Sequence, residues 1–274
     1  MNRTYTPEHP IVLGLHGRAL TGKTVTANGI APMGPPKTLA YQPITWDHLF
    51  YALPIYRMAT AKQKIEGVGA EDRIKYEIHA TLLELFGGSP LWGAPPYDEL
   101  IDMVNTLAAI PAPPGYKPRT FLQQAGTLCR GWDPDCFIKW MNNKITTKFA
   151  TYLEELRLEE LEANEMDEVA SSVGFGVVVS DIRFENEARL VTDRRNGVLV
   201  KLWAREDVLQ ERSMKRDGRV LSKTQASHES ENQEIPEELF DYVLDTSDMS
   251  VSEQIVAVKK ILANTLKGLP NAAC

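Results

Sequence analysis

Short apolar runs alternate along the chain with segments of helical periodicity. Ile11–His16 is apolar, begins with β-branched residues and is followed at once by Gly17, which predicts a short buried strand. Further strands are expected at Thr38–Gln42, Phe175–Ser180, Val198–Trp203 and Phe240–Leu244. The strand at Phe240–Leu244 has the weakest pattern of this set.

Apolar residues at helical spacing fill most of the chain between the second and third strands. The helices expected there are Trp46–Lys64, Arg73–Phe86, Tyr97–Ile110, Thr120–Cys129, Asp135–Phe149 and Tyr152–Val169. Pro54 is expected to kink or split the first of them, because proline cannot donate the backbone hydrogen bond of a helix interior. Outside this region, helices are expected to start at Val25–Ile30 and to run over Val251–Leu266.

Strands separated by helices predict a parallel sheet joined by right-handed crossovers. We therefore expect a single α/β domain over residues 1–274, with a five-stranded parallel sheet flanked by helices. Its core is expected at 11–45 and 170–266, and a helical insert at about 46–169. Ligands of such sheets bind at the carboxyl ends of the strands.

Composition narrows the classes of partner. The chain has 30 Lys and Arg against 37 Asp and Glu, a formal net charge of -7. Proteins that hold polymeric nucleic acid by its phosphates usually have a basic excess, so a nucleotide partner is expected to be a small molecule at a local basic site. No uncharged apolar run approaches the ~20 residues that cross a bilayer, and the N-terminal segment has no apolar core, so neither a membrane partner nor a signal peptide is expected.

Cysteine usage indicates the compartment. The chain has 3 cysteines, and Cys129 and Cys136 lack the spacing of a CxxC pair. This argues against a disulfide framework and a thiolate zinc site, and favours a reducing cytoplasm.

A glycine-rich motif follows the first strand. Gly17, four further residues and then Gly22-Lys23-Thr24 satisfy the P-loop pattern, with a strand before it and a helix after it. Glycines allow a tight turn whose N–H groups point at phosphate oxygens, and the following helix adds its positive end. Lys23 would reach the β- and γ-phosphates, and the Thr24 hydroxyl would hold Mg²⁺. The expected nucleotide-binding residues are Gly17, Arg18, Ala19, Leu20, Thr21, Gly22, Lys23 and Thr24.

A carboxylate and an arginine stand at the end of the third strand. Asp181 is placed to act on Mg²⁺ or its waters, and the alternative is that Ser180 or Asp181 caps a helix that opens near Ile182. No second carboxylate follows Asp181, which favours phosphoryl transfer over ATP hydrolysis for mechanical work. Arg183 can grip a phosphate bidentately, or it can pair on the surface with Glu185 and Glu187.

These segments carry a resemblance to a known family. Val179–Glu187 resembles the signature of the deoxynucleoside monophosphate kinases typical of bacteriophages, which are P-loop kinases related in fold to adenylate kinase. Arg119–Thr127, continuing to Arg130, looks like the acceptor-side helix of that family, although Leu128-Cys129 stands where an acidic or polar residue is expected. Further similar stretches are Asn196–Leu202, His228–Glu231 and Asp241–Asp245.

The resemblance implies transfer of the γ-phosphoryl group of ATP to a (deoxy)nucleoside 5′-monophosphate, with Mg²⁺, in the cytoplasm of a phage host. The sequence is also compatible with a homodimer. The implied catalytic residues are Lys23, Arg183, Arg212 and Arg216. The implied substrate-binding residues are Arg119, Gln123, Arg130, Asp181 and Arg183, and the implied metal ligands are Thr24 and Asp181. Arg130 can instead pair with Asp133 or Asp135.

A second basic group contains Arg212, Lys215, Arg216 and Arg219. Arg212 and Arg216 share a helix face, and the resemblance implies that residues of about 211–230 form a lid that closes over the phosphates. The alternative is a solvated basic helix end that complements the helix dipole.

Base recognition has several candidates. Gln123 or Gln124 could bond the edge of a base, and Gln123 is the better placed because it lies beside Arg119. Aromatic residues that could stack on a base, or belong to the core, are Trp46, Phe121 and Trp132. His228, Glu229 and Glu231 are expected to be polar residues of the surface and not metal ligands, and His16 and His79 are expected to be structural.

Two other functions are compatible with the motifs. Phosphomevalonate kinases of the animal type share the architecture and a similar Ser-Asp-x-Arg stretch, which Ser180–Arg183 matches. A nucleotide-dependent switch or assembly ATPase, whose helical insert binds a protein, would hydrolyse ATP without an acceptor or bind it without turnover.

Overall fold

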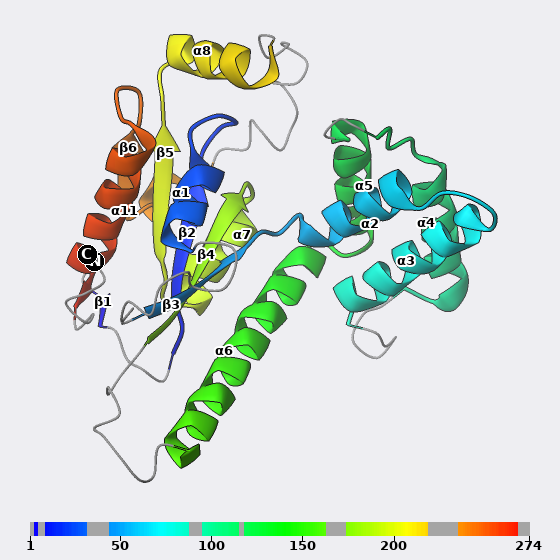
Figure 1. Ribbon diagram of the computed structural model, residues 1–274, viewed down its shortest axis with the longest axis horizontal. Helices are drawn as coiled ribbons and strands as arrows, with labels where there is room; N and C mark the ends of the chain where they lie inside the picture. The colour runs from blue at the N-terminus through cyan, green and yellow to red at the C-terminus, as the bar shows by residue number, and fades with distance from the viewer. Residues whose placement is uncertain are drawn as a thin grey trace. The chain divides into compact units, whose positions relative to one another are not determined.

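The protein divides into a sheet-containing unit and a helical unit (Figure 1). The first consists of residues 1–50 and 145–274, and the second of residues 51–144, within the range expected for an insert. The computed structural model describes residues 3–4, 9–31, 44–87, 95–114, 118–162, 174–218 and 235–267.

A parallel sheet of five strands, in the order β3-β4-β2-β5-β6, forms the centre of the first unit. Its strands are β2 (Ile11–His16), β3 (Ile44–Leu49), β4 (Gly174–Ile182), β5 (Val198–Trp203) and β6 (Tyr242–Asp245). The expected α/β class and five-stranded parallel sheet are confirmed. The strand expected at Thr38–Gln42 lies outside the described residues. A separate short ladder pairs β1 (Arg3–Thr4) with β7 (Leu266–Lys267).

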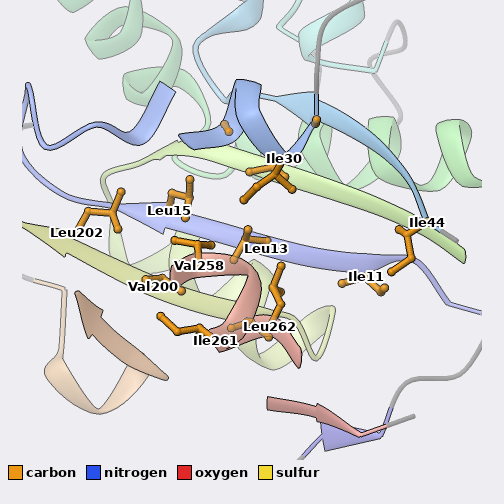
Figure 2. Close-up of a cluster of buried hydrophobic side chains, with 14 residues drawn as sticks. Ile11, Leu13, Leu15, Ile30, Ile44, Val200, Leu202, Val258, Ile261 and Leu262 are labelled. Atoms are coloured by element: carbon orange, nitrogen blue, oxygen red, sulfur yellow. The ribbon is translucent and has the colours of Figure 1, made fainter. Parts of the chain in front are cut away.

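One face of the sheet packs against α1 (Lys23–Ile30) and α11 (Val251–Thr265). Successive side chains of a strand point to opposite faces, so Leu13 and Leu15 of β2 lie on the same face. Figure 2 shows them beside Ile30 of α1 and Val258 of α11, and all four belong to one buried apolar cluster. This packing fixes the start of α1 at the carboxyl edge of the sheet.

Further helices adjoin β4: one packs on the start of the strand and others follow its end. Phe149 and Tyr152 of α6 (Cys136–Glu162) pack on Phe175 at the start of β4, with ring centroids 6.0 and 5.3 Å away. After β4, the chain forms α7 (Glu185–Arg189) and the π-helical turn Leu190–Arg194, and it then enters β5. α8 (Glu206–Asp217) follows β5, and a 3-10 turn at Glu237–Leu239 precedes β6.

Two predictions in the middle of the chain are wrong. Trp46–Leu49 belongs to β3 and not to a helix, because this segment pairs with β4, where Asp47 lies opposite Val177. Pro54 neither kinks nor splits a helix, because it stands in the first turn of α2 (Leu53–Lys64), where a missing N–H costs no hydrogen bond.

The second unit is a cluster of helices around its own core. Its helices are α2, α3 (Ala70–Leu85), α4 (Tyr97–Ala109), α5 (Arg119–Trp132) and the first part of α6. Among the largest fully buried side chains are Met58, Ile78, Leu82, Leu107, Phe121 and Met141. The helices expected at Asp135–Phe149 and from Tyr152 onward are one continuous α6 as far as Glu162. In the described part of the chain, no helix has both the length and the apolar character to span a bilayer.

Candidate functional site at the carboxyl edge of the sheet

The loop of residues 17–22 leads from the centre of the sheet into α1. Gly17 has a φ of 149°, and a Cβ there would come within 2.3 Å of the Leu202 carbonyl oxygen. Gly22 has a φ of 95° and precedes the first helical residue. Between them, Leu20 has a φ of 71°, which is rarely adopted by a residue with a side chain. The loop therefore combines two glycine-dependent positions with one strained residue.

Several carbonyl oxygens of this loop accept hydrogen bonds from side chains. Lys23 Nζ donates to the carbonyls of Gly17 and Arg18, the latter at 2.7 Å. The Thr21 hydroxyl donates to the Arg18 carbonyl at 2.9 Å. Arg212 donates to the Leu20 carbonyl at 3.1 Å, so side chains occupy oxygens at both ends of the loop.

The backbone N–H groups of the loop behave differently. In the described parts of the chain, those of Ala19, Leu20, Gly22 and Thr24 form no hydrogen bond. Unpaired N–H groups beside the start of a helix attract an anion, because they donate hydrogen bonds and carry the positive end of the helix dipole. The loop thus offers backbone N–H donors, while the carbonyl oxygens of Gly17, Arg18 and Leu20 already accept hydrogen bonds.

Burial and three nearby cations lower the pKa of His16, which lies at the end of β2. Its pKa is lowered to about 4, mainly by burial, with smaller contributions from Lys23, Lys201 and Arg183. Because a carbonyl only accepts, His16 donates from Nδ1 to Ile182 at 3.0 Å and carries its hydrogen there. Its ring also contacts Phe240, with centroids 5.3 Å apart. Lys23 at the start of α1 and Arg183 directly after β4 both stand at the carboxyl edge of the sheet, where β2 and β4 are neighbours.

The low pKa of His16 predicts acid sensitivity. The unfolded chain takes up a proton at this imidazole near pH 6.5, whereas the folded chain does so only near pH 4. Stability is therefore complete above pH 6.5 and is lost as the pH falls towards 4, by about 3 kcal/mol from this group alone. Urea unfolding between pH 7 and 4.5 should show a shallower decline for His16→Gln than for the unmodified protein.

An exposed histidine provides the control for this measurement. His9→Gln should retain the pH dependence of the unmodified protein, because His9 is exposed. Parallel curves for His16→Gln and the unmodified protein would show that burial of His16 does not govern the acid response.

Asp181 lies in the last part of β4 and is partly exposed. The alternative that Ser180 or Asp181 caps the next helix is wrong, because β4 continues to Ile182 and the cap of α7 is Phe184. The Glu187 side chain caps the start of α7 instead. Its Oε2 accepts hydrogen bonds from the N–H groups of Arg183 and Phe184 at 2.8 and 3.2 Å.

A partly buried set of polar side chains adjoins Asp181, and no motif in the sequence indicates it. His48 of β3 donates from Nδ1 to Asn28 Oδ1 of α1 at 2.9 Å, and its Nε2 accepts from the Ser180 hydroxyl at 2.6 Å. Burial lowers the pKa of His48, which favours the neutral form that this arrangement requires. These side chains tie α1 to the strand that carries Asp181.

Arg183 is partly exposed directly after β4. Of the two glutamates considered as its surface partners, Glu185 bonds Arg189 at 2.7 Å, and Glu187 is buried with an exposed fraction of 2%. Lys201 of β5 is a further cation, which belongs to none of the sequence motifs, and it bonds Glu237 at 2.7 Å.

The expected lid begins on α8. Arg212 is partly buried and faces the loop, whereas Arg216, one turn later, is exposed. Glu206 at the start of the same helix bonds Arg18 at 2.7 Å. Arg219, His228, Glu229, Glu231 and the rest of the lid range to residue 230 lie outside the described residues.

In the helical unit, the acceptor-side candidates share α5. Arg119, Gln123 and Arg130 are partly exposed, and their spacing of four and seven residues places them on one helix face. The rise of a helix separates the backbone of Arg119 and Arg130 by about 16 Å. The guanidinium of Arg130 lies 4.7 Å from the centre of the Phe137 ring, and Asp133 bonds Lys139 at 2.8 Å.

The aromatic candidates differ in exposure. Phe121 is completely buried and belongs to the core of the helical unit, so stacking of Phe121 on a base is wrong. Trp46 packs partly buried against the core of the sheet unit, and Trp132 is 38% exposed. Cys129 and Cys136 are buried thiols whose pKa values are raised by burial, to about 12 for Cys129, which makes them unreactive.

Three or more His, Cys, Asp or Glu side chains do not cluster into a metal-binding group anywhere in the described ranges. No model of a known protein family matches the chain, and no curated protein sequence matches it.

Proposed function

We propose that the protein transfers the γ-phosphoryl group of ATP to a (deoxy)nucleoside 5′-monophosphate. The observation that carries the proposal is the loop of residues 17–22, where N–H groups without partners in the described chain precede α1 at the carboxyl edge of a parallel sheet. A polyphosphate is the anion that this arrangement suits, because it accepts several hydrogen bonds at once.

Lys23 supports a donor site at this loop. Its ammonium group donates to the carbonyls of Gly17 and Arg18, and it would exchange these for oxygens of the β- and γ-phosphates. Arg183 would add a second cation, since it directly follows β4, the parallel neighbour of the strand that leads into the loop. These charges would stabilise the negative charge that shifts during phosphoryl transfer.

The donor set at the loop suits Mg²⁺. Thr24 is exposed at the start of α1 and Asp181 is partly exposed near the end of β4, and both offer oxygen. Mg²⁺ prefers oxygen and commonly takes one or two protein ligands, with water and substrate phosphate for the rest. When bound, Mg²⁺ would neutralise charge on the β- and γ-phosphates.

The α5 face supports an acceptor site for a molecule with a phosphate at one end and a base at the other. Arg119 and Gln123 are one turn apart, and Arg130 is too far from Arg119 to share one oxygen readily. Arg119 or Arg130 would hold the phosphate and Gln123 would bond the base edge. Arg216 would act from the lid.

The proposed reaction needs no strong general base. An ionised phosphate oxygen of the acceptor forms a bond to the γ-phosphorus, and the bond from that phosphorus to the β,γ-bridging oxygen breaks. The products are ADP and a (deoxy)nucleoside diphosphate. Positioning and charge neutralisation then account for catalysis.

A coupled assay of ADP release tests the proposal. With MgATP present, addition of dTMP, dGMP, dCMP or dAMP should raise the rate by about 100-fold or more over hydrolysis by water, because a closed site excludes water. Equal rates with and without every monophosphate would contradict the proposal.

Two further arms identify the alternatives. Stimulation by phosphomevalonate alone would assign the related small-molecule kinase activity. ATP hydrolysis that no acceptor changes, or binding without turnover, would assign a switch or assembly ATPase.

A further inference from the structure

Arg212 was expected to reach across the phosphates from a lid, but its contacts lead elsewhere. The guanidinium donates from one nitrogen to the Leu20 carbonyl at 3.1 Å, and from the other to the Thr246 carbonyl at 2.6 Å. The first nitrogen also lies 3.3 Å from the Thr246 hydroxyl. Both terminal nitrogens are therefore engaged with backbone or hydroxyl oxygens behind the loop.

Arg212 holds the carbonyl group of the residue whose backbone is strained. Leu20 has a φ of 71°, a conformation that a side chain disfavours unless surrounding contacts enforce it. A hydrogen bond to its carbonyl fixes the orientation of the peptide that links Leu20 to Thr21. The N–H of Leu20 belongs to the donors without a partner in the described chain.

The neighbouring carbonyl is held from the same side. The Gln254 amide of α11 donates to the Thr21 carbonyl at 3.1 Å, and the Thr246 hydroxyl lies 3.3 Å from that oxygen. Thr21, Thr246 and Gln254 are all at least 98% buried, so water does not compete strongly for these bonds. α8 and α11 together fix two successive carbonyls of the loop.

We propose that Arg212 is a positioning residue that holds Leu20 in the conformation in which the loop binds a triphosphate. This inference rests on the proposed function, because it assigns the loop to MgATP. Arg212 then acts on nucleotide affinity through the backbone of Leu20 and not by contact with the transferred phosphoryl group.

The inference is tested by combining changes at Arg212 and Leu20. Isothermal titration with MgATP should show binding weakened by about 30-fold in Arg212→Met, because the strained loop relaxes, and by about 10-fold in Arg212→Lys, which keeps the charge but not the two-pronged geometry. In a Leu20→Gly background, where the φ is no longer costly, Arg212→Met should weaken binding by less than about 3-fold.

Arg189→Met provides the matched control, because Arg189 is exposed and bonds Glu185 and Asp193 of its own helical segment. It should bind MgATP within about 2-fold of the unmodified protein, as expected for a surface pair. Far-ultraviolet circular dichroism of every variant verifies that the chain is folded.

The outcomes separate this inference from the proposed function. If the unmodified protein binds MgATP and Arg212→Met binds it equally well, the positioning role is overturned and the nucleotide site stays in place. The same holds if Arg212→Met loses affinity by a factor that Leu20→Gly does not reduce. A lower kcat with unchanged MgATP affinity in Arg212→Met assigns the lid role instead. Unmodified protein that binds no MgATP overturns the proposed function, and this inference with it.

Discussion

Replacing Lys23 with alanine is expected to lower kcat/KM for ATP by about 1,000-fold, a loss of about 4 kcal/mol of transition-state stabilisation, while the protein remains folded. The charge removed is the one placed nearest to the loop carbonyls of Gly17 and Arg18. Without it, the γ-phosphoryl group would lose both its alignment and a compensating charge. The measurement is steady-state phosphorylation of the best monophosphate found in the coupled assay.

Lys260→Ala is the control for this variant. Lys260 is an exposed lysine on α11, so the substitution removes the same charge from the protein without touching the loop. Its kcat/KM should equal that of the unmodified protein. Activity that survives in Lys23→Ala would mean that the triphosphate binds at a different place.

Gly17→Ala is expected to abolish MgATP binding and to lower the free energy of unfolding by about 3 kcal/mol. A Cβ at this position would come within 2.3 Å of the Leu202 carbonyl oxygen and 2.8 Å of the Thr21 hydroxyl. The first obstacle is backbone of a central strand and cannot rotate away, so β5 or the loop has to shift. Titration with MgATP and urea unfolding measure the two effects separately.

A second glycine shows that the effect depends on position. Gly131 lies on α5, and a Cβ there would meet no atom within 4 Å. Gly131→Ala should leave MgATP binding unchanged and raise stability by about 0.5–1 kcal/mol, because alanine favours a helix more than glycine does. Normal MgATP binding by Gly17→Ala would contradict the conformation described for the loop.

Local patterns were sufficient for the centre of the sheet. Ile11–His16 and Val198–Trp203 coincide with β2 and β5, because a run of buried apolar residues next to glycine or a helix start has few alternatives. The strand order was not predicted from the sequence, since pairing of β2 with both β4 and β5 depends on contacts between distant segments.

Long-range pairing also explains the errors. Trp46–Leu49 carries apolar residues whose spacing suits a helix, but the partner strand β4 decides its conformation. The helices on either side of Phe149 were separated without a proline or glycine between them, and the structure joins them in α6. A proline within a helical pattern predicts a break, whereas Pro54 stands in the first turn of α2, where proline favours the start of a helix.

The same distinction between local patterns and long-range contacts applies to the candidate site. The loop of residues 17–22 was predicted because all of its residues are consecutive, and glycine spacing reports backbone geometry directly. The contribution of Thr246 and Gln254 was not predicted, because neither residue type has a distinctive pattern and each meets the loop only in the folded chain. His48 was missed for the same reason.

The hydrogen bonds behind the loop also constrain when the protein can become competent. Leu20 and Thr21 are bonded to residues 192, 225 and 233 positions further along the chain. Contacts of such sequence separation form slowly, because a long stretch of polypeptide must first be ordered. During translation, a ribosome would therefore have released the whole glycine-rich segment long before α8, β6 and α11 emerged to shape it. Synthesis that stops short of α11 should yield chains that carry the motif but not its braced form.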